Sequence, residues 1–250
     1  MTPFDYLLPA TLAEASAVSA EADATTRFLA GGTDLTVGLR HGHVSADLVI
    51  DLKAVAELKS DIVRDADRLR ISAGVTMTEL RRYLAEHAPF PALRDAADVV
   101  GSIQIRNRAT LVGNICKASP AADTVPVLAA LGAEVEIYGP GGTRKRSVSE
   151  FIEGNRQIDL GRGELVSAVL IPLPEVPQGC AFDRITRRRG VDLATTNMCC
   201  KISGAGQVVF AFGAVSPRPL VVRDESGLLG DPTAPETGRA EAIRQLASHA

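Results

Sequence analysis

The sequence predicts an α+β protein with a larger body up to about residue 172 and a smaller α+β region after it. Two observations predict this architecture. Short apolar segments with strand patterning alternate with N-capped helical segments, and a proline-rich stretch, residues 171–177, separates the two parts. Of the 250 residues, 46% are hydrophobic and 23% are charged. These proportions are typical of a globular protein and exclude the disordered and fibrous classes.

The first fifty residues alternate between helix and strand signals. A capping box at residues 11–14 predicts a helix that continues to about residue 22. The apolar runs 27–30 and 48–50 predict two buried strands, and the i, i+4 spacing of Leu35 and Leu39 predicts a helix between them. This β-α-β alternation favours a parallel or mixed sheet with helices on its faces.

The remainder of the chain continues the pattern with more strands and capped helices. The signals are a strand over 68–74, a capping box at 76–79 followed by a helix, a helix from Pro126 to Gly132, a strand over 133–138, a capping box at 147–150, a hairpin formed by 198–203 and 207–212, and a helical tail over 235–250.

Charge and composition exclude several function classes. A net charge of −3 gives no electrostatic basis for binding nucleic acid. No apolar run approaches the ~20 residues of a membrane span, and the N-terminus lacks the pattern of a signal peptide. The histidines form no metal signature. The four cysteines, which are interpreted as buried free thiols, have no C-x-x-C spacing. We therefore expect a cytoplasmic protein without a metal site.

One segment with possible chemistry surrounds the paired glycines Gly31 and Gly32. Glycines directly after a buried strand let backbone N–H groups approach an anion without interference from Cβ, and such groups can cradle a phosphate. Thr33 adds a hydroxyl donor. The alternative is a tight strand–helix turn in which Thr33 or Asp34 caps the helix.

A second segment, residues 101–123, is dense in small, hydroxyl and amide side chains. The carboxylate of Asp123 could accept hydrogen bonds from ribose hydroxyls. The alternative is a polar loop region in which Arg106 and Arg108 are solvated. Neither segment has the G-x-G-x-x-G pattern of a Rossmann loop in the required strand–helix context, and the P-loop pattern is absent.

Together, the two segments resemble one family. The motifs are Ala30-Gly31-Gly32-Thr33-Asp34-Leu35, then Gln104-Ile105-Arg106-Asn107 leading into Ala109-Thr110-Leu111-Val112-Gly113-Asn114, and then Ala118-Ser119-Pro120-Ala121-Ala122-Asp123. They are similar to the FAD-binding motifs of the medium subunit of molybdenum hydroxylases, the xanthine dehydrogenase and carbon monoxide dehydrogenase flavoprotein family. The likeness continues through 163–166 and 182–194, so it covers nearly the whole chain in order.

The resemblance implies a fold and a set of cofactor contacts. The fold is a two-subdomain FAD-binding fold of the vanillyl-alcohol-oxidase/PCMH type over residues 1–172, with subdomains at about 1–55 and 56–172. A C-terminal flavoprotein domain with an antiparallel sheet follows over 178–250 and is shorter than is common in the family. The implied FAD-binding residues are Leu29, Ala30, Gly31, Gly32, Thr33, Asp34, Leu35, Val100, Thr110, Gly113, Asn114, Asp123, Val166, Arg184, Asp192 and Leu193.

The resemblance also implies a role in electron transfer. FAD on this chain would receive electrons from 2Fe–2S clusters on a small partner subunit and pass them to an external acceptor. A large partner subunit would carry the molybdopterin cofactor, and the assembly would be a dimer of heterotrimers. No residue of this chain would be catalytic and none would bind a metal. In such a role the cofactor performs the redox chemistry and the protein binds and orients it.

One departure and two alternatives accompany this interpretation. Val112 stands where the family usually has the first of two glycines, and we expect it to crowd the second phosphate loop slightly. A self-contained FAD/nicotinamide reductase of related fold would explain the same motifs. So would a scaffold subunit that has lost its flavin, for which Val112 is the only supporting feature. An unrelated nucleotide-binding regulator would not explain the order of the motifs.

Overall fold

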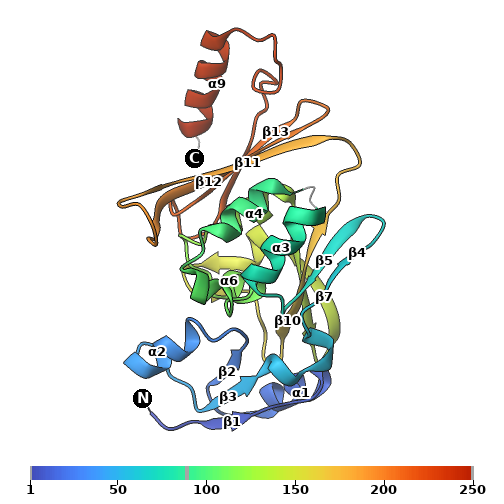
Figure 1. The fold of residues 1–250 in the computed structure, drawn as a ribbon, viewed down its shortest axis with the longest axis vertical. Helices are drawn as coiled ribbons and strands as arrows, with labels where there is room; N and C mark the ends of the chain where they lie inside the picture. The colour runs from blue at the N-terminus through green and yellow to red at the C-terminus, as the bar shows by residue number, and fades with distance from the viewer. Residues whose placement is uncertain (1, 88–89, 249–250) are drawn as a thin grey trace.

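A computed structural model describes residues 2–87 and 90–248. The chain forms three units along its long axis (Figure 1): an N-terminal three-stranded unit at one end, a central five-stranded sheet with helices, and a C-terminal four-stranded sheet that carries the last helix. Most buried apolar residues of the three units form one large cluster, which extends from Ala15 to Ala211, and a smaller cluster around Leu39 lies in the N-terminal unit. The units are therefore packed together rather than strung along a linker.

The N-terminal unit has a parallel sheet with strand order β1-β3-β2, as the β-α-β alternation predicts. The Thr11 hydroxyl accepts a hydrogen bond from the Glu14 N–H at 3.1 Å, so the first capping box forms. Strand β1 was not expected from the sequence. The elements are β1 (Asp5–Leu7), α1 (Leu12–Glu21), β2 (Thr26–Leu29), α2 (Leu35–His41) and β3 (Leu48–Asp51).

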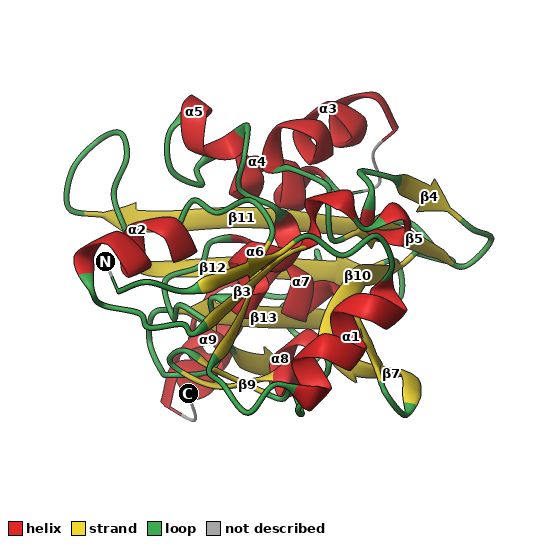
Figure 2. Ribbon diagram, turned by 90° about the horizontal axis from the view of Figure 1, so that it is seen from below, coloured by secondary structure: helices red, strands yellow, loops and turns green. Residues whose placement is uncertain are grey.

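The central unit is built on an antiparallel sheet with strand order β4-β5-β10-β6-β7. Its middle strand, β10, is buried along almost its whole length because other elements cover both faces (Figure 2). Its elements are η1 (Leu52–Ala54), η2 (Ala56–Leu58), β4 (Ile62–Arg64), β5 (Arg68–Ser72), α3 (Met77–His87), α4 (Pro91–Asp98), α5 (Ile103–Arg106), α6 (Leu111–Cys116), α7 (Thr124–Leu131), β6 (Glu134–Gly139), β7 (Gly142–Ser147), α8 (Val148–Phe151), β8 (Ile152–Gly154), β9 (Gln157–Ile158) and β10 (Leu165–Pro172).

The C-terminal unit is an antiparallel sheet with strand order β11-β12-β13-β14. Along β11, half-buried and exposed residues alternate, so one face of the sheet is covered and the other is open. Strand β11 packs against α4 and β12 packs against α7. Its elements are β11 (Gln178–Thr186), β12 (Ala194–Ser203), β13 (Val208–Gly213), β14 (Leu220–Arg223) and α9 (Glu236–Ser248).

Most of the elements expected from local patterns are present, with small shifts at their ends. The capping boxes at 76–79 and 147–150 form, and Gly132 ends α7 with a φ of +72°. The predicted hairpin is β12–β13, and the helical tail is α9, whose last two expected residues lie outside the described range. The prediction of four buried thiols was too strong: Cys199 is buried, whereas the other three cysteines are only partly buried. No described helix is both long and apolar enough to cross a membrane.

Candidate functional site

The glycine-rich turn lies between β2 and α2, where the sequence predicts it. Gly32 has a φ of +77°, a left-handed conformation that favours glycine. Among the described residues, the backbone N–H groups of Gly31, Gly32, Thr33 and Asp34 have no hydrogen-bond acceptor. Consecutive N–H groups without partners in a turn form a concavity suited to an anion. The side chains of Thr33 and Asp34 do not cap α2, which removes the main support for a purely structural turn.

The second segment meets the first turn through backbone contact. A Cβ added to Gly31 would lie 2.0 Å from the carbonyl oxygen of Arg108, far closer than any real Cβ contact. Only glycine therefore allows the two segments to approach each other at this point. The sequence places Gly31 and Arg108 in separate motifs, and the fold brings them into van der Waals contact.

Thr110 organises the second segment. Its hydroxyl accepts a hydrogen bond from the Gly113 N–H at 3.0 Å and so caps α6, a short helix that was not expected from the sequence. The Met77 N–H donates to the Ala109 carbonyl at 2.8 Å, which ties this segment to the start of α3. The segment around Arg108, which contacts Gly31, is thus fixed to the central unit by this hydrogen bond.

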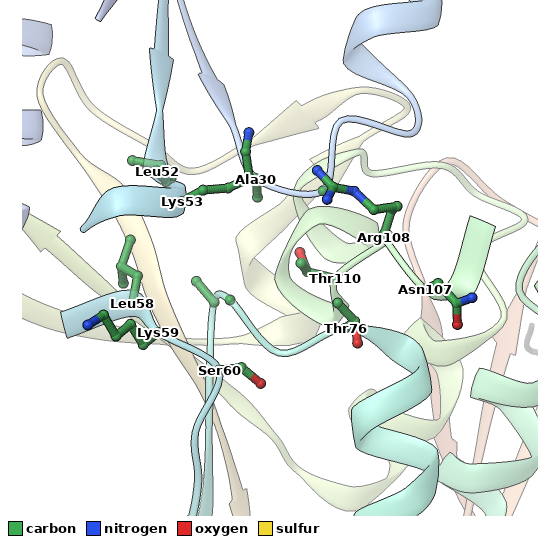
Figure 3. A pocket seen from close by; sticks show the side chains of 13 residues that line it. Ala30, Leu52, Lys53, Leu58, Lys59, Ser60, Thr76, Asn107, Arg108 and Thr110 are labelled. Carbon is green, nitrogen blue, oxygen red and sulfur yellow. The ribbon is translucent and has the colours of Figure 1, made fainter. Parts of the chain in front are cut away.

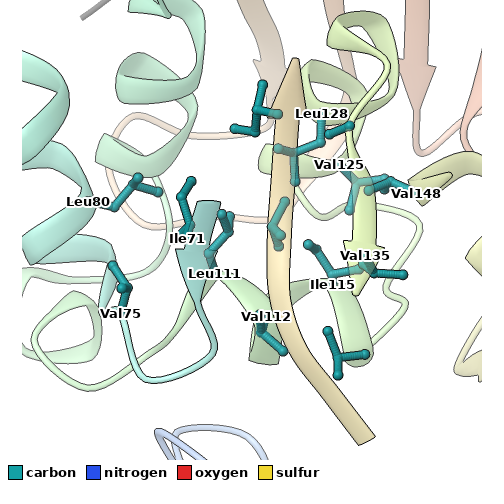
Figure 4. Packing of buried hydrophobic residues seen from close by; sticks show 14 of the residues in the cluster. Ile71, Val75, Leu80, Leu111, Val112, Ile115, Val125, Leu128, Val135 and Val148 are labelled. Atoms are coloured by element: carbon teal, nitrogen blue, oxygen red, sulfur yellow. The ribbon is translucent and has the colours of Figure 1, made fainter. Parts of the chain in front are cut away.

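The expectation that Val112 crowds this loop is not supported by its position. Its side chain is 5% exposed and packs in the apolar cluster beside Leu111 and Ile115 (Figure 4). Its backbone N–H, in the first turn of α6, has no partner among the described residues. A valine here contributes to the core and still leaves its N–H available, because the side chain and the N–H point to different sides of the helix end.

We expect Val112→Gly to destabilise the protein by about 2–4 kcal/mol, because it removes a buried side chain and adds a glycine to a helix. FAD affinity should stay within a few-fold of the wild-type value. Urea unfolding and FAD titration measure the two effects. Val37→Gly on α2 is the matched control, since Val37 is 52% exposed and only helix propensity is lost. A large gain in FAD affinity in Val112→Gly would show that the valine does crowd the loop.

The two segments border a cavity of about 220 Å³ (Figure 3). This volume is below the ~300–1,000 Å³ of a typical pocket for a whole small ligand, so the cavity suits one part of an extended ligand. Three of the residues proposed from the sequence line it. The lining residues are Ala30, Gly31, Leu52, Lys53, Leu58, Lys59, Ser60, Ala73, Gly74, Thr76, Asn107, Arg108 and Thr110.

Three cations at this cavity were not identified as functional from the sequence. Lys53 and Lys59 follow the predicted strand 48–50 without any motif, and Arg108 was considered only in the alternative in which it is solvated. The side chains of Lys59 and Arg108 have no ion-pair partner among the residues that the structure describes. Positive charge beside unpaired N–H groups and hydroxyls is an arrangement that could hold a phosphate or diphosphate.

Lys53 is oriented by a buried carboxylate. Asp51, which is 2% exposed, accepts hydrogen bonds from the Lys53 ammonium at 2.5 Å, from the Lys53 N–H at 3.0 Å and from the Tyr6 hydroxyl. Burial alone raises the pKa of Asp51, but the hydrogen bonds from Lys53 and Tyr6 outweigh it, so the pKa lies below its ordinary value of 3.8. Asp51 therefore remains ionised and holds Lys53 at the edge of the cavity.

The pKa of Asp51 is lower in the folded protein than its ordinary value of 3.8. Its ionised carboxylate therefore stabilises the fold at pH values above 3.8, and this contribution is lost as the pH falls through and below that value. We expect Asp51→Asn to cost about 1–3 kcal/mol at pH 7 and much less at pH 3. Urea unfolding at both pH values measures the difference. Asp5→Asn, at an exposed position on β1, is the control variant. An equal cost of Asp51→Asn at both pH values would contradict this account.

Other predicted residues extend the site from this cavity toward the C-terminal sheet. Asp34 forms an ion pair with Lys117, just beyond α6. The Asn114 side-chain oxygen accepts a hydrogen bond from the Thr124 hydroxyl at 2.7 Å, next to Asp123. These contacts connect the first turn, α6 and the start of α7.

A second polar cluster lies where the central unit meets the C-terminal sheet. The buried carboxylate of Asp123 accepts hydrogen bonds from Arg184 at 2.8 Å and from the Asn197 amide at 2.9 Å. Burial raises the pKa of Asp123, although Asn197 and Arg184 act in the opposite direction. Arg184 also donates to the Asp192 carbonyl at 3.3 Å. Residues from β11, β12, their hairpin loop and α7 thus meet here.

Two buried atoms in this cluster have no hydrogen-bond partner within the described part of the chain: Asp192 Oδ2 and Asn197 Oδ1. Buried polar atoms without partners are rare in native proteins and often mark a ligand position. Burial tends to raise the pKa of Asp192, but Arg188, the Leu193 N–H and Arg187 together lower it. The Asp192 carboxylate therefore remains ionised beside a hairpin loop rich in arginine.

The other predicted residues lie in differing environments. Leu29 and Leu35 pack against a small apolar cluster around Leu39. Val100 is half-buried beside the core, and Val166 is 4% exposed within β10 and does not line the cavity. Leu193 is 69% exposed in the β11–β12 loop.

The arrangement fits an elongated dinucleotide with a diphosphate. The unpaired N–H groups of the Gly31 turn and the cations of the adjacent cavity would hold the anion, and the polar cluster at Asp123 would bind hydroxyl groups. The fold and this arrangement are those expected of a dinucleotide-binding protein with two ligand-binding loops and an attached antiparallel sheet.

Comparison with known proteins agrees with a dinucleotide-binding fold. Residues 2–174 match the model of the FAD binding domain in molybdopterin dehydrogenase. The nicotinate dehydrogenase FAD-subunit of Eubacterium barkeri is 30% identical over 250 residues, which covers 96% of this chain and 84% of the relative. Quinoline 2-oxidoreductase from Pseudomonas putida 86 matches with a TM-score of 0.87 at 30% identity, over 97% of this chain and 85% of that one. CO dehydrogenase from Oligotropha carboxidovorans matches with a TM-score of 0.89 at 26% identity, over 99% and 87%.

The chain belongs to the family of FAD-binding domains of molybdopterin dehydrogenases. It is an oxidoreductase subunit of the xanthine dehydrogenase type whose cofactor is FAD. The α+β fold expected from the resemblance is confirmed by the solved structures.

Proposed function

We propose that this chain is the electron-delivering flavoprotein subunit of a molybdenum hydroxylase. FAD supplies the one- and two-electron chemistry that links an iron–sulfur partner to an external acceptor. The chain's own residues bind the cofactor, orient it and exclude water from part of it, and none acts as a proton-transfer catalyst. The observation that supports this most directly is the contact between Gly31 and Arg108, which joins two sequence motifs into one anion cradle.

Within this proposal, the diphosphate lies between the two loops. The N–H groups of Gly31 to Asp34 face it from one side and the Thr110–Gly113 turn from the other, with Arg108 and Lys53 supplying positive charge. The remaining proposed contacts lie further along the same path. They are Leu29, Ala30, Leu35, Val100, Asn114, Asp123, Val166, Arg184, Asp192 and Leu193.

The proposed partners are those of the relatives. The CO dehydrogenase medium chain of Afipia carboxidovorans is 28% identical over 205 residues, and its name identifies it as one chain of a larger enzyme. We infer a molybdopterin-binding large subunit and a small subunit with two 2Fe–2S clusters, assembled as a dimer of heterotrimers. A cytoplasmic location belongs to the same proposal, because all four cysteines are free thiols and disulfides are rare in that compartment.

The first experiment is to purify the chain and identify the flavin released on denaturation. We expect FAD, with a visible flavin spectrum in the native protein. A chain that contains no FAD and does not take up added FAD would instead be a scaffold subunit. Oxidation of NADPH by the isolated chain would instead identify a self-contained reductase.

The second experiment tests the partners. A tagged chain purified from its native host should bring with it a molybdopterin-containing chain and an iron–sulfur chain, identified by mass spectrometry and metal analysis. In that complex, the iron–sulfur centres should become reduced together with the flavin when the enzyme's substrate is added. Reduction of the metal centres without reduction of the flavin would refute the proposed electron path.

A further inference from the structure

Two cysteines of the C-terminal sheet lie next to each other across adjacent strands. Cys180 is on β11 and Cys199 is on β12, and their sulfur atoms are 3.2 Å apart. In the antiparallel register, Cys180 is opposite Lys201 and Phe182 is opposite Cys199, so the two thiols are diagonal neighbours on one face. This face is the covered one, which packs against α4 and α7.

The other two cysteines are not positioned to pair with Cys180 or Cys199. Cys200 follows Cys199 directly, and successive residues of a strand point to opposite faces, so its thiol faces away. Cys116 lies on α6 in the central unit, and burial raises the pKa of its thiol to about 12. The sheet geometry therefore selects one pair out of the four cysteines.

The two thiols have different environments that suit different roles. Cys180 is partly exposed and can meet a small oxidant, whereas Cys199 is fully buried. The hydrogen bond from Cys199 lowers the pKa of the Cys180 thiol, partial burial opposes this, and the Lys201 ammonium lowers it further. The hydrogen bond with Cys180 and burial raise the pKa of Cys199. Cys180 is thus the better nucleophile, since the thiolate is the reactive form.

We propose that Cys180 and Cys199 are a dithiol that oxidises reversibly to a disulfide across β11 and β12. With a diazene oxidant such as diamide, the Cys180 thiolate attacks one nitrogen of the N=N bond. Cys199 then attacks the sulfur of that adduct. One S–S bond forms, two S–H bonds break, and the two electrons and two protons pass to the diazene, which leaves as a hydrazine.

The disulfide would have a local structural consequence. It would close the chain between 180 and 199, a segment that contains Arg184 and Asp192 of the polar cluster at the unit boundary. Diagonal cross-strand neighbours are spaced more widely than a relaxed disulfide requires, so the bond should be readily reduced. The pair is therefore suited to restraining this hairpin reversibly. This inference does not depend on the electron path proposed above.

The test uses the full chain, treated with diamide and then alkylated. We expect the number of free thiols to fall from four to two by intact mass, and glutathione should restore all four. Trypsin provides an independent readout, because Arg187 and Arg188 are 78% and 70% exposed in the loop between the two cysteines. After cleavage there, the two fragments should stay joined on a non-reducing gel only in the oxidised protein.

Two serine variants identify the pair. Cys180→Ser, at a partly exposed position, should abolish both the thiol loss and the joined fragments, whereas Cys200→Ser should retain both. Four free thiols in native protein after diamide treatment would overturn the proposal. So would a cross-link that persists in Cys180→Ser or disappears in Cys200→Ser, and failure of glutathione to restore the thiols would overturn its reversibility.

Discussion

Replacement of Gly31 by alanine is expected to weaken FAD binding by about 10–100-fold. The added Cβ would lie 2.0 Å from the Arg108 carbonyl oxygen, so the two loops would have to move apart. Overpacking of this kind costs roughly 1–3 kcal/mol, which corresponds to that loss when the energy falls on the bound state. FAD titration of the apoprotein, followed by flavin fluorescence, measures the effect.

Gly141→Ala is the matched control for this variant. Gly141 lies in the turn between β6 and β7, and a Cβ there meets no atom within 4 Å. Its FAD affinity and its urea midpoint should equal those of the wild type. If Gly31→Ala also bound FAD with wild-type affinity, the contact between the two loops would not be what forms the cofactor site.

Arg184→Met is expected to destabilise the protein by about 3–5 kcal/mol. Arg184 and Asp123 are buried together at the boundary between the central unit and the C-terminal sheet, with side chains 13% and 8% exposed. Among the described residues, removing the guanidinium leaves the buried carboxylate with Asn197 as its one remaining partner. Breaking a buried ion pair from one side has a cost of this magnitude. Urea unfolding at neutral pH measures the change.

Arg187→Met provides the control, because Arg187 lies three residues further along the same hairpin and is 78% exposed. Its guanidinium is solvated and approaches Asp192 only at 3.4 Å, and Arg188 faces the same carboxylate, so we expect a change of about 0–1 kcal/mol. The double variant Asp123→Asn/Arg184→Met should recover part of the loss, since no unpaired buried charge remains. Equal stabilities of Arg184→Met and Arg187→Met would contradict the buried ion pair.

Local sequence patterns predicted the secondary structure well where the signal was contained within a few residues. Each capping box forms, because a hydroxyl and a carboxylate three residues apart can satisfy the N–H groups of the same turn. The patterns missed many of the observed elements, among them β1, α4, α6, β10 and β11. Strand β1 is stabilised by pairing with β3, and α6 is stabilised by burial of its own Leu111 and Ile115 in the apolar core. Both elements therefore depend on residues that are distant in the sequence.

The candidate site shows the same division. The glycine turn was proposed from its own residues, because the backbone freedom of glycine is a local property. The role of the Thr110–Gly113 turn was implied by the family resemblance. Lys53, Lys59 and Arg108 were missed as site residues, since nothing in their neighbourhoods distinguishes them from solvated cations. Val112 was interpreted as an obstruction because the sequence does not reveal that its side chain enters the core.

The sequence by itself determined the α+β class, the order of the motifs and the chemistry that they could perform. It did so because capping, turn formation and strand alternation depend on residues that are close along the chain. Only the tertiary structure decided that Gly31 touches Arg108, that Arg184 pairs with Asp123, and that Cys180 lies beside Cys199. Those contacts depend on strand register and on packing between units. Burial of a shared apolar core brings together residues that are up to about a third of the chain apart in sequence.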